Sequence, residues 1–60
     1  MARYKIGDTV KYKFDETNEI YEVIRYKHMP KLIFYVLEDN KGERHDCYYP
    51  NKLKLIKRLI

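Results

Sequence analysis

The sequence predicts an all-β protein, and two observations support this prediction. Residues that favour strands because they are β-branched or aromatic (Ile, Val, Thr, Tyr and Phe) occupy 20 of the 60 positions, whereas alanine, the strongest helix former, occurs once. Hydrophobic and polar residues also alternate with a period of two in short segments that turn-forming residues separate. Both observations favour strands along most of the chain.

The first strand is expected at residues 9–14, directly after the turn signal Gly7-Asp8. Hydrophobic residues occupy alternate positions of this segment and therefore share one face: Val10, Tyr12 and Phe14. The positions between them are polar and share the other face: Thr9, Lys11 and Lys13. Residues 15–18 are polar without a hydrophobic anchor, which is typical of a loop.

Residues 20–28 admit two interpretations. Tyr21 and Val23 alternate as in a strand, whereas Ile20, Val23 and Ile24 have the spacing of one helix face. The density of β-branched and aromatic residues favours a strand, with a bulge near Ile24-Arg25 that switches the inward face. Pro30 ends this element, because the residue before a proline is driven out of the helical region.

A tight hairpin is the clearest local prediction. The unbroken hydrophobic run at residues 32–37 is typical of a central strand that is covered on both faces. Asn40-Lys41-Gly42 then predicts a three-residue hairpin loop in which Gly42 supplies the positive φ of a G1 bulge. The returning strand is expected at residues 43–49.

The C-terminal segment is the second ambiguous one. Pro50-Asn51 interrupts the chain, and Lys52-Leu53 is expected to form a single 3₁₀ turn. A closing strand at about residues 54–58 is favoured, because a helix of eight residues would be marginally stable. The alternative is a helix that Asn51 caps and whose face carries Leu53, Ile56, Leu59 and Ile60.

The order of these elements resembles the small SH3-like β-barrel, in its short bacterial and phage form and in KOW-type modules. The resemblance rests on residues 5–10 (KIGDTV), 21–23 (YEV), 34–42 (FYVLEDNKG) and 53–56 (LKLI). It implies one five-stranded barrel domain over residues 1–60. It bears on fold more than on function, because one fold hosts many unrelated functions.

One short segment is also similar to eukaryotic SH3 domains. Tyr49-Pro50-Asn51 matches the segment before their last strand, which in those domains helps to line a groove for proline-rich peptides. The chain contains no tryptophan and no Ala-Leu-Tyr-Asp-Tyr run. We therefore do not expect it to bind polyproline peptides.

Length and composition argue against several classes of function. A domain of this size buries only about 60% of the surface that its unfolded chain exposes. A catalytic pocket of roughly 300–1,000 Å³ would take up most of such a core. We therefore expect no enzyme, no small-molecule substrate and no cofactor. Charged residues interrupt every hydrophobic run, so we also expect no membrane span.

The single cysteine and the N-terminal residues bear on the cellular compartment of the protein. Cys47 is alone, so the chain cannot form an internal disulfide. The first five residues, MARYK, lack the hydrophobic stretch of a secretory signal. Together these features predict a location in a reducing cytoplasm.

Candidate metal-binding and catalytic residues are few. His45 and Cys47 are two residues apart and share one strand face, which His28 could approach. A structural zinc site needs four ligands, and the sequence offers one close pair. We expect no metal, with Cys47 packed as a small hydrophobic residue and His45 solvated. The pair also lacks an orienting third group, so no catalytic residue is expected.

Tyrosine content and charge bear most on function. The chain has seven tyrosines and a net charge of +4. Basic surfaces with interleaved aromatic rings bind nucleic acid, because cations pair with phosphates while the rings stack on bases. Alternation places Tyr12, Tyr21 and Tyr35 in the core. The exposed candidates are then Tyr4, Tyr26, Tyr48 and Tyr49.

The first functional hypothesis is a small nucleic-acid-binding module. Its cations lie in three stretches of the chain, and the first and last strands are neighbours in an SH3-like barrel. That arrangement would bring their outward lysines together. The candidate binding residues are Lys11, Lys13, Arg25, Tyr26, Lys27, Tyr48, Lys54 and Lys57.

The second hypothesis is a protein-interaction module. It would be a phage or mobile-element accessory protein that binds a host protein, or a barrel that self-associates as a homodimer. Homodimerisation would compensate for the small core. The charge does not decide between the hypotheses, because residues 15–22 carry four acids and residues 52–58 carry four bases. The observation that supports the protein-interaction hypothesis is the apolar C-terminal end, which contains Leu53, Leu55, Ile56, Leu59 and Ile60.

Overall fold

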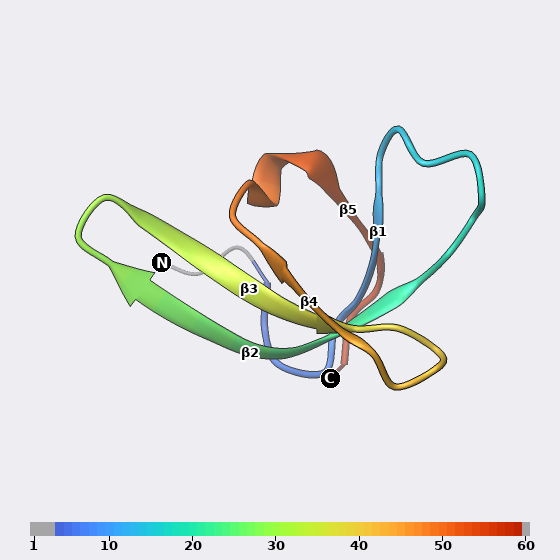
Figure 1. Ribbon diagram of the computed structural model, residues 1–60, viewed down its shortest axis with the longest axis horizontal. Helices are drawn as coiled ribbons and strands as arrows, with labels where there is room; N and C mark the ends of the chain where they lie inside the picture. Colours follow the sequence, from blue (N-terminus) through green and yellow to red (C-terminus); the bar gives the residue numbers. More distant parts are fainter. Residues whose placement is uncertain (1–3, 60) are drawn as a thin grey trace.

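The computed structural model of the protein describes residues 4–59 and confirms the all-β prediction within them (Figure 1). Five antiparallel strands form one sheet, and a single 3₁₀ turn precedes the last strand. No helix in the described part of the chain is long and apolar enough to cross a membrane. The elements are β1 (Thr9–Tyr12), β2 (Tyr21–Met29), β3 (Leu32–Glu38), β4 (Arg44–Cys47), η1 (Pro50–Lys52) and β5 (Leu53–Lys57).

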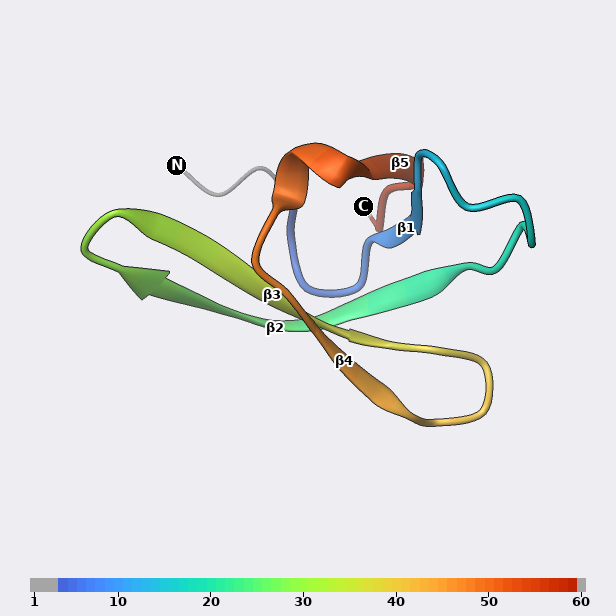
Figure 2. The ribbon, with the colours of Figure 1, turned by 45° about the horizontal axis from the view of Figure 1, so that its top comes forward.

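The strand order in the sheet is β4-β3-β2-β1-β5. β4 and β5 are its two edges, and the sheet is not closed into a barrel. The sheet bends so strongly that the β1–β5 pair lies over the part formed by β2, β3 and β4 (Figure 2). This bend encloses the core between the two parts of a single sheet.

The strand interpretation of residues 20–28 is confirmed, and so is the bulge. Val23 pairs with Leu37 and Arg25 pairs with Val36, so Ile24 is the extra residue that shifts the register. Beyond the bulge β2 pairs with β3 as far as Met29, and the two strands form a hairpin that extends away from the other strands (Figure 1). The bulge therefore sets which side chains of the hairpin face outward.

The predicted β3–β4 hairpin is also confirmed. The N–H of Gly42 donates to the carbonyl oxygen of Asp39 at 3.1 Å, and the N–H of Asp39 donates to the carbonyl oxygen of Glu43 at 2.9 Å. Gly42 has a φ of +83°, which glycine adopts at no steric cost. This is the geometry of a three-residue loop that closes with a G1 bulge.

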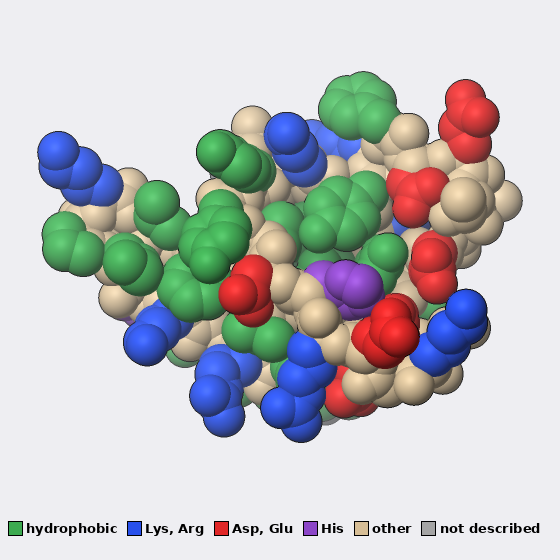
Figure 3. Space-filling model, viewed as in Figure 1, with side chains coloured by type: hydrophobic (Ala, Val, Ile, Leu, Met, Phe, Trp, Pro, Cys, Tyr) green, Lys and Arg blue, Asp and Glu red, His purple; other side chains and the backbone are tan. Residues whose placement is uncertain are grey.

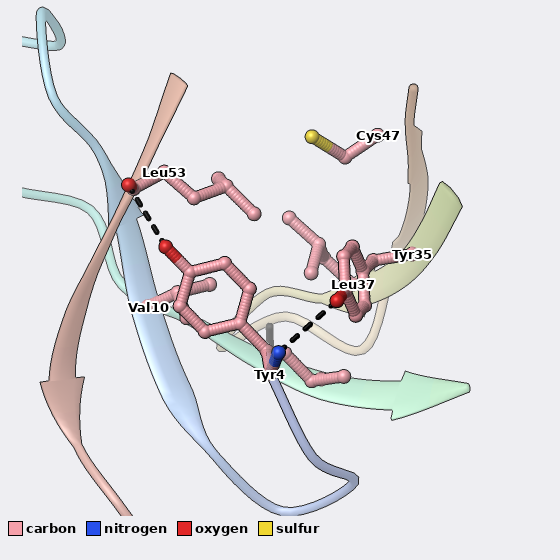
Figure 4. Packing of buried hydrophobic residues seen from close by; sticks show 7 residues of the cluster. Tyr4, Val10, Tyr35, Leu37, Cys47 and Leu53 are labelled. Carbon is pink, nitrogen blue, oxygen red and sulfur yellow. Dashed lines mark hydrogen bonds between the residues drawn. The ribbon is translucent and has the colours of Figure 1, made fainter. Parts of the chain in front are cut away.

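The buried core lies where the two parts of the sheet face each other (Figure 4). Tyr35, predicted to be buried, is fully so, while Tyr12 and Tyr21 are partly buried and pack against the cluster. Cys47 is buried with them, as expected of a small hydrophobic residue. The buried hydrophobic side chains are Tyr4, Val10, Val23, Tyr35, Leu37, Cys47 and Leu53.

Tyr4 was expected to be exposed, and that prediction is wrong: its exposed fraction is 5%. The chain before β1 turns back at Gly7, whose N–H donates to the carbonyl oxygen of Val23 at 2.8 Å. This turn brings the Tyr4 hydroxyl to the carbonyl oxygen of Leu53, to which it donates at 3.0 Å (Figure 4). The backbone N–H of Tyr4 donates to the Tyr35 hydroxyl, also at 3.0 Å.

Two other expectations about burial are corrected. Phe14 is 86% exposed, because a turn at residues 12–15 ends β1 early; in it the N–H of Asp15 donates to the carbonyl oxygen of Tyr12 at 3.3 Å. β3 is not covered on both faces. Tyr35 and Leu37 are buried on its inner face, while Phe34 and Val36 on its outer face are only partly covered.

The C-terminal segment forms the expected strand rather than the helix. The predicted 3₁₀ turn exists, but it occupies residues 50–52, and Leu53 opens β5. After β5, the buried carboxylate of Asp8 accepts a hydrogen bond from the N–H of Leu59 at 3.2 Å. Arg58 also pairs with this carboxylate at 3.6 Å. These contacts attach the end of the chain to the turn before β1.

Candidate functional site

Seven of the eight predicted binding residues separate into two groups, and the first group lies on β1 and β5 or directly after β1. Val10 pairs with Leu55 and both face the core, so the residues next to them, Lys11 and Lys54, face outward directly opposite each other. Lys57 pairs with Thr9, on the same outer side. The N–H of Lys13 donates to the carbonyl oxygen of Lys52 at 2.8 Å, which extends the pairing by one step. We call Lys11, Lys13, Lys54 and Lys57 the lysine row.

The lysine row takes part in no ion pair among the described residues, although the hydrogen bonds from Thr17 and, after them, the nearby charge of Lys11 lower the pKa of Asp15. The ion pairs among residues 4–59 involve Arg44, His45 and Arg58, and none involves a lysine. Lys11 reaches a neutral group, the side-chain oxygen of Asn18, at 3.3 Å. Like charges directly opposite in an antiparallel pair are destabilising. The strand pairing therefore places two like charges on directly opposite residues.

The second group lies on the outer face of the β2–β3 hairpin. Arg25 pairs with Val36 and Lys27 pairs with Phe34, on the face opposite the buried Tyr35. The ring of Phe34 packs against the ring of Tyr48, with their centroids 5.0 Å apart and their planes at 35°. We call Arg25, Lys27, Phe34 and Tyr48 the outer hairpin face. Hydrophobic side chains gather over this end of the molecule, with Lys and Arg side chains along its lower edge (Figure 3).

Tyr26 belongs to neither group. It pairs with the buried Tyr35 and so lies on the inner face of the hairpin. Its ring centroid is 6.2 Å from that of Tyr35 and 6.0 Å from that of His28. The structure therefore does not bring Tyr26 together with Arg25 and Lys27.

Acidic residues separate the lysine row from the outer hairpin face. Thr9 pairs with Glu22, and Glu22 pairs with Glu38, so two carboxylates lie between the groups on the outer side of the sheet. Glu38 has Arg44 as a partner at 3.9 Å. The predicted residues thus form two basic surfaces rather than one continuous face.

Sequence reasoning missed Phe34. The hydrophobic run at residues 32–37 predicted that both faces of β3 are buried. It therefore gave no reason to assign Phe34 and Tyr35 to opposite faces. The pairing register reveals it, because Lys27, directly opposite Phe34, points outward. Strict alternation counted from Tyr35, which was expected in the core, would have placed Phe34 outward.

His45 was expected to be solvated, but it is only partly exposed. It is partly buried, its Nε2 lies 2.9 Å from Oδ2 of Asp39, and its ring meets Tyr21 edge-on at 5.5 Å. The N–H groups of Lys41 and Glu43 donate to the other oxygen of Asp39, both at 2.9 Å. The hydrogen bond from His45, followed by those two, holds the pKa of Asp39 below its ordinary value.

The same turn contains a group of residues that could ligate a metal. One ligand atom each of Asp39, Glu43 and His45 lies within 4.8 Å of the others. Both oxygens of Asp39 already accept hydrogen bonds, so the bracing of the turn accounts for the grouping. His28 and Cys47 are not members of this group. We assign it no metal.

A shallow hollow of about 430 Å³ lies between the inner side of the hairpin and η1. No carboxylate lines it, and its polar side-chain groups belong to His28, Lys31 and the hydroxyl of Tyr35. It offers no pair of groups arranged for acid–base or nucleophilic chemistry. Its lining consists of His28, Met29, Lys31, Leu32, Ile33, Tyr35 and Pro50.

Comparisons of the chain with protein-family models, with curated proteins and with solved structures gave no match. The geometry of the two basic surfaces is therefore the ground for a functional proposal.

Proposed function

We propose that this protein is a small, non-catalytic binding module that binds nucleic acid, with the lysine row as its contact to the phosphate backbone. One observation carries the proposal: Lys11 and Lys54 face each other across the β1–β5 pair, and no lysine of residues 4–59 has an ion-pair partner. Features that oppose stability are typical of functional sites.

The physical basis is the release of counterions. A nucleic acid carries a dense row of phosphates, and each cation that neutralises one releases condensed salt ions. Neighbouring strands are about 4.8 Å apart and alternate residues of one strand about 6.7 Å apart, so flexible lysine stems can reach successive phosphates. Four contacts would give a slope of log K against log salt of about −3.6 on a duplex and about −2.8 on a single strand.

The proposal includes the SH3-like or KOW-type interpretation of the fold. Five antiparallel strands, a strong bend and a 3₁₀ turn before the last strand support it. In this interpretation the first and last strands are neighbours, and that contact creates the lysine row. A location in the cytoplasm remains a prediction from the lone cysteine.

Fluorescence anisotropy of labelled oligonucleotides at low salt tests the proposal. The double variant Lys11→Gln/Lys54→Gln removes two row charges and should weaken binding on the order of ten-fold. The matched control Lys5→Gln/Lys41→Gln removes the same net charge from exposed sites outside both basic surfaces and should cost about three-fold or less. Equal losses in both variants, or no binding tighter than about 1 mM, would refute the proposal.

A protein-interaction module is the second candidate function. Its support is exposed apolar surface at two places: Met29 and Leu32 at the end of the hairpin, and Ile56 and Leu59 near the C-terminus. Ile60, part of the same expectation, lies outside the described residues. Sedimentation equilibrium of the chain with and without residues 57–60 tests the self-associating form. A dimer that dissociates on truncation would support it, and a monomer in both cases would exclude it.

A further inference from the structure

The outer hairpin face contains two aromatic rings that the core does not use. Tyr48 is 48% exposed, and its ring lies 5.0 Å from that of Phe34 at an angle of 35°. The core lies on the other side of β3, around Tyr35 and Leu37. Tyr48 thus presents an exposed aromatic ring on the outside of the sheet, and the partly buried ring of Phe34 packs against it.

Charge is distributed unevenly on either side of these rings. Lys27 lies directly opposite Phe34 on β2, with Arg25 two residues before it, and neither cation has an ion-pair partner. The sequence contains no acid between Glu22 and Glu38. On the other side, Asp46 of β4 accepts a weak hydrogen bond from the Tyr48 hydroxyl at 3.5 Å. The face is basic along β2, aromatic in the middle and acidic at β4.

The order from the basic strand to the aromatic rings matches the order from phosphate to base in a nucleotide strand. Phosphates are attracted to Arg25 and Lys27 and repelled by Asp46, so the backbone would follow β2. Bases extending from a backbone in that position would lie over the exposed ring of Tyr48, against which Phe34 packs. Exposed aromatic rings stack on unpaired bases, whereas the bases of a duplex are already stacked on one another.

We infer that the outer hairpin face is a stacking platform for single-stranded nucleic acid, with its phosphates on Arg25 and Lys27 and its bases on the ring of Tyr48, which packs against Phe34. This inference rests on the proposed function and narrows it to one class of ligand. The lysine row would then bind further phosphates of the same ligand without distinguishing single strands from duplexes.

Two oligonucleotides and two variants test the inference. The ligands are a single strand of about 12 nucleotides, within the site sizes of small single-strand-binding folds, and a duplex of the same length. Tyr48→Leu removes a stacking ring but keeps hydrophobic bulk. Tyr49→Leu is the matched control, since Tyr49 is 63% exposed and its ring contacts Lys52 instead. Urea unfolding of each variant checks that the fold is kept.

The expected result is at least ten-fold tighter binding of the single strand than of the duplex. Tyr48→Leu should weaken single-strand binding on the order of ten-fold and leave duplex binding and the salt slope unchanged. Tyr49→Leu should change neither affinity by more than about two-fold. The chain has tyrosines but no tryptophan, so quenching of tyrosine emission by a stacked base can be read directly and should decrease in Tyr48→Leu.

Two outcomes would overturn the inference, and they differ. Equal affinity for both ligands with no effect of Tyr48→Leu would exclude a stacking platform and leave the lysine row as a backbone contact. Absence of binding to either ligand at low salt would remove the proposed function and the inference together. If Tyr48→Leu alters the fold, Arg25→Gln/Lys27→Gln serves instead and should weaken single-strand binding more than duplex binding.

Discussion

The two ends of the β2–β3 hairpin are made of the same two strands but differ in what surrounds them. At one end, Val23 and Leu37 pair and are fully buried beneath β1 and β5. At the other end, Met29 and Leu32 also pair but are nearly half exposed. The difference arises from strand length, because β1 pairs with β2 only at residues 21 and 22 and β4 pairs with β3 only from residue 35 onward.

This contrast assigns stability and binding to different parts of the hairpin. The covered end contributes apolar burial, the dominant favourable term in folding. The uncovered end contributes little burial, and the outer hairpin face lies between the two ends, on the side of the sheet away from the core. Changes at the covered end should alter unfolding more than changes at the uncovered end, and changes on the outer hairpin face should alter binding.

The largest expected effect comes from one substitution made at both ends of β3. Leu37→Ala should destabilise the protein by about 2–5 kcal/mol, because it leaves a cavity in the core. Leu32→Ala should cost less than about 1 kcal/mol, because this side chain is 42% exposed. Urea unfolding followed by circular dichroism measures both. Similar costs would contradict the contrast between the two ends.

Removing single tyrosine hydroxyl groups should also change the free energy of unfolding, but by less than the leucine substitution at the covered end. Tyr4→Phe loses the hydrogen bond to the carbonyl oxygen of Leu53 and should cost about 1 kcal/mol, since the bond is buried. Tyr48→Phe loses only the exposed 3.5 Å contact with Asp46 and should leave the free energy of unfolding nearly unchanged. A larger loss in Tyr48→Phe than in Tyr4→Phe would refute this assignment.

Lys54→Gln should stabilise the protein slightly. It removes the repulsion between Lys54 and Lys11, worth a few tenths of a kcal/mol at low salt. The gain should vanish near 1 M salt, where the screening length falls to about 3 Å. Lys27→Gln is the control, since Lys27 faces the uncharged Phe34. A gain that persists at high salt would show that charge repulsion is not its cause.

Acid should weaken the β3–β4 turn through Asp39. Its pKa in the folded state lies below the ordinary value of 3.8, so the unfolded chain binds this proton more tightly. The stabilisation is therefore complete above about pH 4 and is lost as the pH falls through the lower, folded pKa. Urea midpoints of the protein and of Asp39→Asn, measured from pH 7 to pH 2, should converge in that acid range. A constant difference would exclude this role for Asp39.

Local features of the fold could be predicted because they depend on neighbouring residues. Gly42 after Asn40-Lys41 specifies a three-residue loop, and the change of the inward face near Ile24 requires a bulge. The closing strand, expected at about residues 54–58 because a short helix would be marginally stable, is found at residues 53–57. Each of these predictions needed only a short stretch of sequence.

Features that depend on distant segments were not predictable. Tyr4 is buried because the turn at Gly7 returns the chain to Leu53, nearly fifty residues away in sequence. The separation of Arg25 and Lys27 from the lysine row depends on the register that places Glu22 and Glu38 between them.

The salt dependence of binding tests the central claim most directly. Affinity for a single strand of about 12 nucleotides would be measured between 50 and 200 mM salt for the protein and for Lys11→Gln/Lys54→Gln. We expect the double variant to have a slope shallower by about 1.4, because two phosphate contacts on a single strand are lost. An unchanged slope would show that Lys11 and Lys54 contact no phosphate and would contradict the account.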